Sequence, residues 1–201
     1  MPVSTFVGGT GGKNFNDDLR RAAKTLAFAN GLRKSVAASG RRWSAMPGGA
    51  QQLAAVLACV DETQQRLAAA VRASDPDAAI AAANAELRAV LEWSTYQSVA
   101  VATARALRVS QRTRAFAERF GLLDSGNPSL ASLAESEESL LENIASKNAY
   151  MASIAERFPQ LALPPPLVNP HALVAPKSER KDPRLQLIQQ LMKPGKKTPR
   201  R

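Results

Sequence analysis

The chain has 201 residues and a formal net charge of +10, and its positive charge lies at the two ends. Residues 1–49 hold eight basic and two acidic side chains, residues 164–201 hold nine and two, and the residues between them hold ten and thirteen. With one cysteine, one histidine and 5% aromatic residues, the composition excludes a disulfide-stapled scaffold and favours Ala- and Leu-rich helices over a β-rich core.

The first 49 residues are predicted to be a flexible basic N-terminal arm that contains one helix. Asn16 is a suitable N-cap, so we expect the helix from there to about Ala38. Its apolar stripe is narrow: Leu19, Ala23, Leu26 and Ala27. Five cations of this arm are candidate phosphate ligands: Arg20, Arg21, Lys24, Arg41 and Arg42. Trp43, beside the last two, is placed to stack on a base, and the alternative is a solvated basic helix face.

A helical hairpin is predicted next, within a bundle that spans residues 50–163. An apolar seam that includes Leu53 and Val60 recurs every three or four residues over 51–74. Asp75-Pro76 then suits the N-cap and the first position of a second helix. The short break between the two seams predicts that the two helices pack against each other.

The second helix is expected to continue to Phe120, because no turn signal interrupts it before Gly121. The residues from Ser94 to Thr103 are mediocre helix formers, and a strand there is the alternative. Beyond them the apolar periodicity resumes: Ala106, Val109, Phe116 and Phe120. A stripe of arginines follows one side of the same segment: Arg105, Arg108, Arg112 and Arg119.

A third long helix is predicted from about Ser129 to Phe158, where Pro159 closes it. Its heptad seam contains the polar Asn148, a residue that often fixes register. An acidic stripe repeats the offsets of the arginine stripe: Glu135, Glu138 and Glu142. If the second and third helices pack antiparallel, these stripes are expected to face each other; the alternative is that the arginines contact phosphate or an acidic partner.

Residues 164–201 are predicted to be a flexible basic tail that begins with three prolines. Asp182-Pro183 starts a short amphipathic helix over 183–192. Its apolar side chains are candidate partner-binding residues: Leu185, Ile188, Leu191 and Met192. Too short to be stable alone, this helix is expected to fold on the bundle, in a partner's groove or on an anionic surface. The end of the tail adds candidate phosphate ligands: Lys196, Lys197, Arg200 and Arg201.

The sequence offers no arrangement of residues typical of catalysis. His171 lies in the proline-rich tail, and Cys59 lies in an apolar run where a small buried hydrophobe is expected. Neither has the neighbours that nucleophilic catalysis or a zinc site requires, so we expect no enzyme, no metal and no cofactor. No segment reaches the roughly 18 apolar residues of a membrane span and the N-terminus lacks signal-peptide features, so we expect a cytoplasmic protein.

Residues 53–163 resemble FlgN-type flagellar export chaperones and related type III secretion chaperones. Asp75-Pro76-Asp77 is similar to the family's break between its first two helices, and Arg114–Leu122, with Phe120-Gly121-Leu122, to the end of its second helix. Asn143–Phe158, with Asn148, resembles its final helix. The family holds terminal helices of a secreted subunit, so the resemblance implies that the final helix binds the client. The implied contact residues are Leu140, Ile144, Met151 and Ile154.

Together these patterns predict an all-α protein, an antiparallel bundle of three to four long helices between flexible basic N- and C-terminal arms. The expected function is that of a non-enzymatic interaction protein: a chaperone, adaptor or assembly factor, in one version a flagellar or type III export chaperone, that binds a protein partner through amphipathic helices. The alternative is a nucleic-acid-associated phage, plasmid or packaging protein with basic arms on a helical core that forms homo-oligomers.

Overall fold

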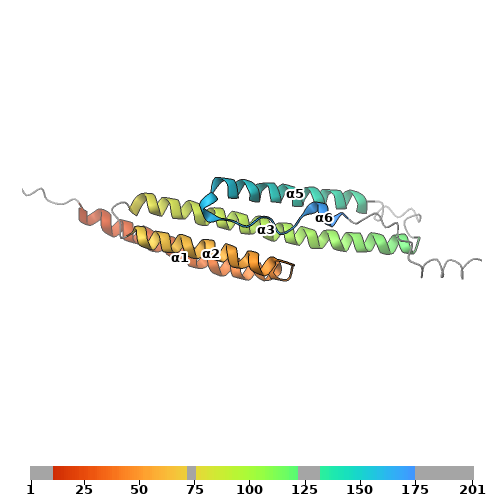
Figure 1. The fold of residues 1–201 in the computed structure, drawn as a ribbon, viewed down its shortest axis with the longest axis horizontal. Coiled ribbons are helices and arrows are strands. Elements are labelled where there is room, and N and C mark those ends of the chain that lie inside the picture. The colour runs from red at the N-terminus through yellow and green to blue at the C-terminus, as the bar shows by residue number, and fades with distance from the viewer. Residues whose placement is uncertain (1–10, 72–75, 122–131, 175–201) are drawn as a thin grey trace, which may run out of the picture.

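The computed structural model describes residues 11–71, 76–121 and 132–174. This part of the chain is all-helical, as predicted, with four long helices packed together (Figure 1). The long helices are α1 (Gly11–Ser44), α2 (Gly49–Ala70), α3 (Pro76–Arg119) and α5 (Leu133–Arg157). A 3-10 turn, η2 (Pro159–Leu161), and a one-turn helix, α6 (Pro170–Leu173), follow α5.

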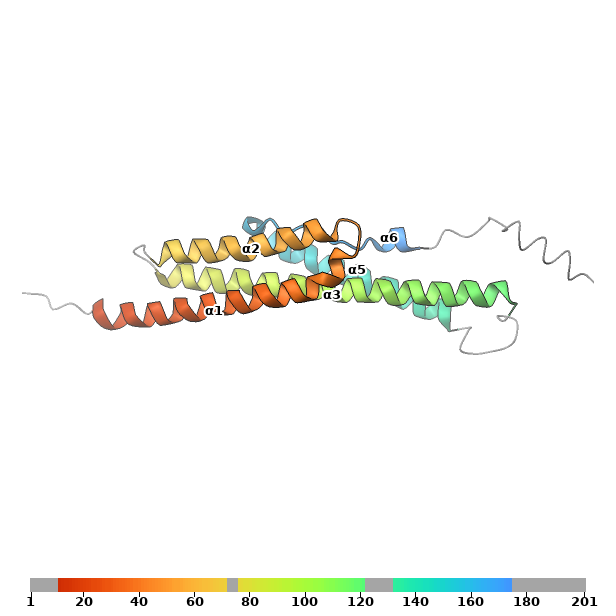
Figure 2. The same cartoon turned by 90° about the horizontal axis from the view of Figure 1, so that it is seen from below.

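α3 is the longest helix, and the others pack along it (Figure 2). α1 runs parallel to α3. Thr25 of α1 bonds Asn84 of α3, and further along both helices Trp43 bonds Ser98. α1 and α2 run in opposite directions, since Asn30 bonds Gln64 and Arg33 bonds Asp61. α5 runs antiparallel to α3, since Thr103 bonds Asn143 and Ser110, further along α3, bonds the earlier α5 residue Glu137.

The connection between α1 and α2 is a tight turn that needs glycine. Gly48 has a φ of 76°, in the left-handed region that side chains rarely adopt. A Cβ on Gly49 would collide with the main-chain oxygen of Trp43. Gly40 allows α1 to approach the side chain of Leu53 on α2, with which a Cβ at position 40 would also collide. The two helices therefore form one closely packed hairpin.

α1 belongs to the bundle, which corrects the prediction that residues 1–49 form an arm apart from it. Its buried residues recur every three or four positions along one face: Ala22, Thr25, Ala29, Leu32, Val36, Gly40 and Trp43. The stripe predicted from the sequence is rotated from this face, since Leu19 is 39% exposed and Ala23 and Ala27 are exposed. The helix also begins earlier than Asn16 and extends past Ala38.

α3 is continuous from Pro76 to Arg119, which confirms the prediction that the helix continues through Ser94–Thr103. The hydroxyl of Thr95 donates to the carbonyl of Leu91 at 2.8 Å, and that of Ser98 to the carbonyl of Ser94 at 2.9 Å. These back-bonds satisfy the hydroxyls within the helix, so mediocre helix formers are accommodated without a break.

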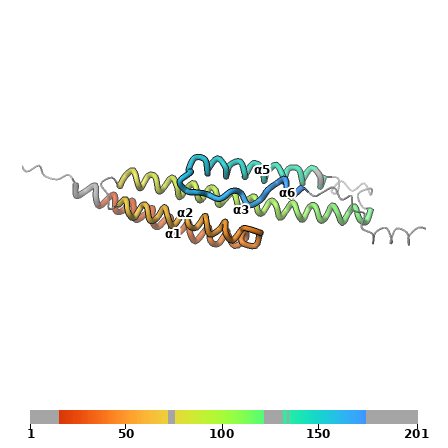
Figure 3. The backbone as a smooth tube through the Cα atoms, in the orientation of Figure 1, coloured from red at the N-terminus to blue at the C-terminus, as the bar shows by residue number. Residues whose placement is uncertain are grey.

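The proline-rich segment after α5 returns along the bundle, as the tube in Figure 3 shows for residues up to 174. We call residues 162–174 the strap. Val168 is 2% exposed within the core, and the side chains of Gln52, Gln97 and Asn148 hold the strap's main chain. The prediction that a free tail begins at residue 164 is therefore wrong as far as 174. The predicted helix over 183–192 lies outside the described residues.

Candidate interaction surfaces

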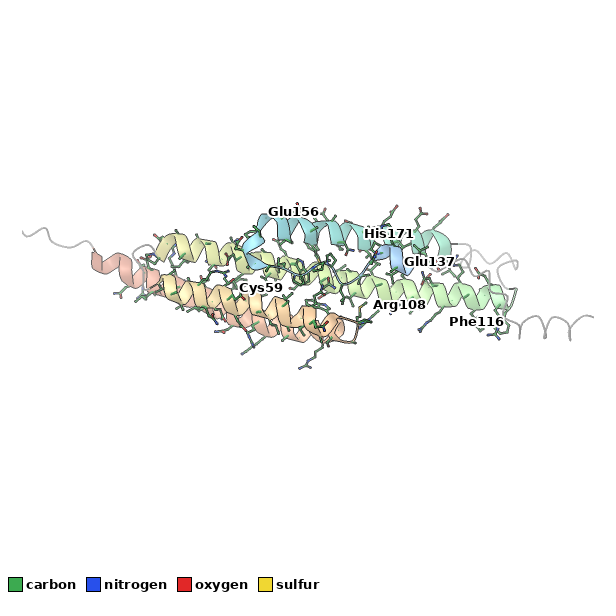
Figure 4. The ribbon with its side chains drawn as sticks, in the orientation of Figure 1. Cys59, Arg108, Phe116, Glu137, Glu156 and His171 are labelled. Carbon is green, nitrogen blue, oxygen red and sulfur yellow. The ribbon has the colours of Figure 1, made fainter. Side chains whose placement is uncertain are left out.

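The arginine and glutamate stripes do not pair, which corrects the prediction that they face each other. On α3, the side chains that meet α5 include Ser110 and Arg114. With about 100° per residue, these lie roughly opposite Arg105, Arg108 and Arg112 on the helix. Figure 4 shows Arg108 on the side of α3 away from α5. The stripes therefore point away from each other, and the ion pair between the two helices is instead Arg114–Glu137, at 2.8 Å.

The residues predicted to bind a client on the last long helix are used inside the bundle. Ile144, Met151 and Ile154 are each at most 1% exposed, and Leu140 is half-buried against the same core. The heptad seam that suggested a binding face is the seam by which α5 packs on α3. The prediction that these four side chains form an open client-binding surface is therefore wrong for this structure. The candidates on the tail lie outside the described residues: Leu185, Ile188, Leu191 and Met192.

The candidate phosphate ligands of α1 are exposed, but two are paired with carboxylates. Arg20 faces Asp17, and Arg21 contacts both Asp18 and Asp77. Among the described residues, the other three have no acidic partner: Lys24, Arg41 and Arg42. Trp43 is fully buried and cannot stack on a base, contrary to one reading of the sequence. The last four candidates lie outside the described residues: Lys196, Lys197, Arg200 and Arg201.

The structure brings together basic residues from two segments that the sequence predicts to be separate, the N-terminal arm and the bundle. The guanidinium of Arg105 donates to the main-chain oxygen of Arg42 at 2.8 Å, where α1 nears its end. The α3 residues whose side chains hydrogen-bond α1 lie seven or fourteen residues apart: Asp77, Asn84, Ser98 and Arg105. The same register continues past the end of α1 to Arg112 and Arg119, which are exposed.

We define the distal face as the exposed side of α3 beyond this point together with Phe120, which directly follows the helix: Arg105, Arg108, Val109, Arg112, Phe116, Arg119 and Phe120. Val109 is 63% exposed, and Phe116 and Phe120 are 58% exposed each. The two phenyl rings contact each other, with centroids 4.5 Å apart. Figure 4 places Phe116 near the end of α3 farthest from α1. The spacing of these apolar residues predicts a packing seam. In the structure they are exposed, because α1 ends before it reaches them.

The buried ionisable groups have structural partners. The Glu86 carboxylate accepts hydrogen bonds from Thr63 at 3.0 Å, Gln160 at 3.1 Å and Arg66. Burial alone would raise the pKa of Glu86, but these bonds and the charge of Arg66 outweigh it and hold the pKa below its ordinary value. The network ties α2, α3 and the segment after α5 together.

Cys59 is buried, as predicted, and burial together with the nearby charge of Glu62 raises the pKa of its thiol to about 11. Its sulfur lies 2.7 Å from the carbonyl oxygen of Leu161. His171 is exposed on α6. Over residues 11–71, 76–121 and 132–174, no group of His, Cys, Asp or Glu side chains is placed to hold a metal ion. None of the described helices has the length and apolar character needed to cross a bilayer.

Comparison with protein-family models, with curated proteins and with solved structures found no match.

Proposed function

We propose that the chain is a non-enzymatic helical interaction protein, an adaptor or assembly factor, that binds an acidic amphipathic helix of a partner protein along the distal face. The observation that carries this proposal is the seven-residue register of α3, which contacts α1 as far as Arg105 and then continues uncovered through Arg112 and Arg119. A partner helix lying on α3 beyond the end of α1 would extend an arrangement that the first part of the molecule already uses.

The chemistry of the distal face favours such a helix. Its apolar members, Val109, Phe116 and Phe120, are more than half exposed, and covering apolar surface contributes roughly 25 cal/mol per Å². The arginines around them have no acidic partner among the described residues. Carboxylates on the partner helix would pair with these arginines and set its direction and register more than its affinity.

An export chaperone of the FlgN type is one form of such a protein, and support for it rests on the sequence resemblance described above. In that version the client would be a terminal helix of a secreted subunit, but its contact surface would be the distal face and not the α5 seam. A cytoplasmic location belongs to this proposal and follows from the sequence expectation.

The test is affinity purification with the full chain as bait from cells that make it. Phe116→Ser with Phe120→Ser removes the apolar part of the distal face, and Arg112→Glu with Arg119→Glu reverses its charge. Tyr150→Ser is the matched control, because Tyr150 is also an exposed aromatic residue, 51% exposed, but lies on α5. We expect one protein with an acidic amphipathic helix to be lost from both distal-face variants and retained by the control. If every protein partner is retained by variants of unchanged helicity, the proposal is wrong.

A nucleic-acid-associated protein is the second candidate, and the contact between Arg42 and Arg105 favours it. That contact joins the cations at the end of α1 to the arginines of α3 in one exposed strip. Such a protein would release counterions on binding, so its affinity for DNA or RNA would fall steeply with salt. Truncation after Val174, which removes nine basic and two acidic residues, would flatten that dependence. If the protein shows salt-sensitive retention on neither DNA nor RNA, this candidate is eliminated.

A further inference from the structure

Three side-chain amides from three different helices hold the main chain of the strap between Pro165 and Val168, and a fourth, Gln111 on α3, donates to the carbonyl of Leu173 at 2.7 Å. Gln52 on α2 donates to the carbonyl of Pro165, and Asn148 on α5 donates to the carbonyl of Val168 at 2.7 Å. Gln97 on α3 accepts from the N–H of Leu167 at 3.3 Å. The groove between these helices therefore holds an extended segment by its main-chain groups, whose positions do not depend on the side chains of that segment.

Each of the three amides is only half satisfied. Gln52 Oε1, Gln97 Nε2 and Asn148 Oδ1 are buried and have no hydrogen-bond partner among the residues that the structure describes. Gln97 is fully buried and Gln52 is 7% exposed. A buried polar atom without a partner is unfavourable, because it has given up its hydrogen bonds to water and gained none in return. The strap thus occupies the groove without completing its hydrogen bonds.

The prolines of the strap explain the deficit at Gln52. Its Oε1 needs a donor, but Pro164, Pro165 and Pro166 have no N–H to offer. The same residues line a hollow of about 390 Å³ together with Gly48, Gln51, Gln52, Ala55 and Leu167. There is consequently both an unused acceptor and unfilled space beside the proline run.

We propose that the groove between α2, α3 and α5 is a binding site for an extended, proline-free segment of a partner protein, and that the strap is its built-in competitor. Such a segment presents a main-chain N–H where the strap presents proline. It would keep the contacts to Gln97 and Asn148, complete the bonding of Gln52 and fill the adjoining hollow. The strap covers the site while no partner is present, favoured by its covalent connection through η2. This site is separate from the distal face.

The test compares two fluorescein-labelled peptides of residues 161–169, one with the native sequence and one with Pro164→Ala, Pro165→Ala and Pro166→Ala. The protein is the full chain with Leu167→Ser and Val168→Ser, which weaken the strap by removing its inward apolar side chains. We expect the alanine peptide to bind about tenfold tighter, because it offers a donor to a buried acceptor. In a further variant with Gln52→Met, the two peptides should bind about equally.

Equal affinities with Gln52 present, tighter binding of the proline peptide, or no binding of either peptide to the helical, strap-weakened protein would each overturn the proposal. If neither peptide binds and light scattering shows that the protein is a dimer, the strap of a second copy occupies the groove instead. If the strap-weakened protein does not fold, hydrogen exchange on the native chain gives the answer. An excess of the alanine peptide should speed exchange of the Leu167 amide at least about threefold over the native peptide, and equal rates would refute the site.

Discussion

The indole rings of Trp43 and Trp93 meet edge to face, with centroids 6.1 Å apart and planes at 78°. Both are fully buried, and the Trp43 ring N–H donates to the hydroxyl of Ser98 at 3.2 Å. The pair fastens the end of α1 to the middle of α3. α1 ends at Ser44, directly after this contact, and the distal face lies on α3 beyond it.

Replacing Trp43 should destabilise the whole bundle. Trp43→Ala removes the largest buried side chain of α1 and leaves a cavity beside Trp93, and we expect the free energy of unfolding to fall by about 3–5 kcal/mol. Urea denaturation followed by circular dichroism measures the change. Arg41→Gln, at an exposed position two residues away, should change it by less than about 0.5 kcal/mol. A loss below about 1 kcal/mol for Trp43→Ala would mean that α1 is not fastened as described.

Three glycines should respond differently to alanine. A Cβ at Gly31 meets nothing within 4 Å, so Gly31→Ala should raise the free energy of unfolding by about 0.5–1 kcal/mol through helix propensity. Gly40→Ala should lower it, because the side chain of Leu53 has to move. Gly49→Ala should lower it most, because its Cβ meets the main chain of Trp43. Thermal melts of the three variants test this order, and stabilisation by Gly49→Ala would contradict the turn.

The Glu86 network should make stability depend on pH in the acid range. The pKa of Glu86 is lower in the folded chain than its ordinary value of 4.5, so its stabilisation is present above that value and is lost as pH falls through the folded pKa. Glu86→Gln should therefore cost about 1–3 kcal/mol at pH 7, and its stability should converge on that of the native chain as pH falls from 4.5 through the lower, folded pKa of Glu86. Urea denaturation at several pH values measures both, with Glu142→Gln as the exposed control. A cost independent of pH would show that the charge of Glu86 contributes nothing.

Cys59 should be inert toward thiol reagents in the folded chain. A rise of its pKa from 9.0 to about 11 lowers the thiolate fraction at pH 8 about 100-fold, and burial blocks access as well. We expect labelling of Cys59 by a disulfide reagent to be at least about 100-fold slower in buffer than in urea. Comparable rates in the two conditions would show that Leu161 does not cover the sulfur as the structure indicates.

The sequence predicted the helical class and the main breaks well, because these depend on local signals. Proline at position 76 starts α3 and Pro159 follows the end of α5, as expected from their missing N–H groups. The role of Asn148 was only partly predicted. It lies in the seam, but its partner is the carbonyl of Val168 in the strap.

What the sequence did not show depends on where separate segments meet. The buried face of α1 has a regular spacing through Leu32, Val36 and Trp43, yet it is rich in alanine and flanked by cations, a composition that predicts an arm. The strap gave no periodic signal, because an extended segment held by side-chain amides needs none. The distal face exists because α1 ends beside Arg105 while α3 continues to Arg119, and no local pattern reports where one helix ends along another.

The most direct measurement is photo-crosslinking in cells that make the protein, with a benzophenone amino acid at position 116 of the full chain. The matched chain carries it at position 150, which is similarly exposed on α5. We predict a covalent adduct to one partner protein from position 116, mapped by mass spectrometry to an acidic amphipathic helix, and no such adduct from position 150. An adduct only to nucleic acid, or the same protein captured from both positions, would contradict the proposal that the distal face binds a partner helix.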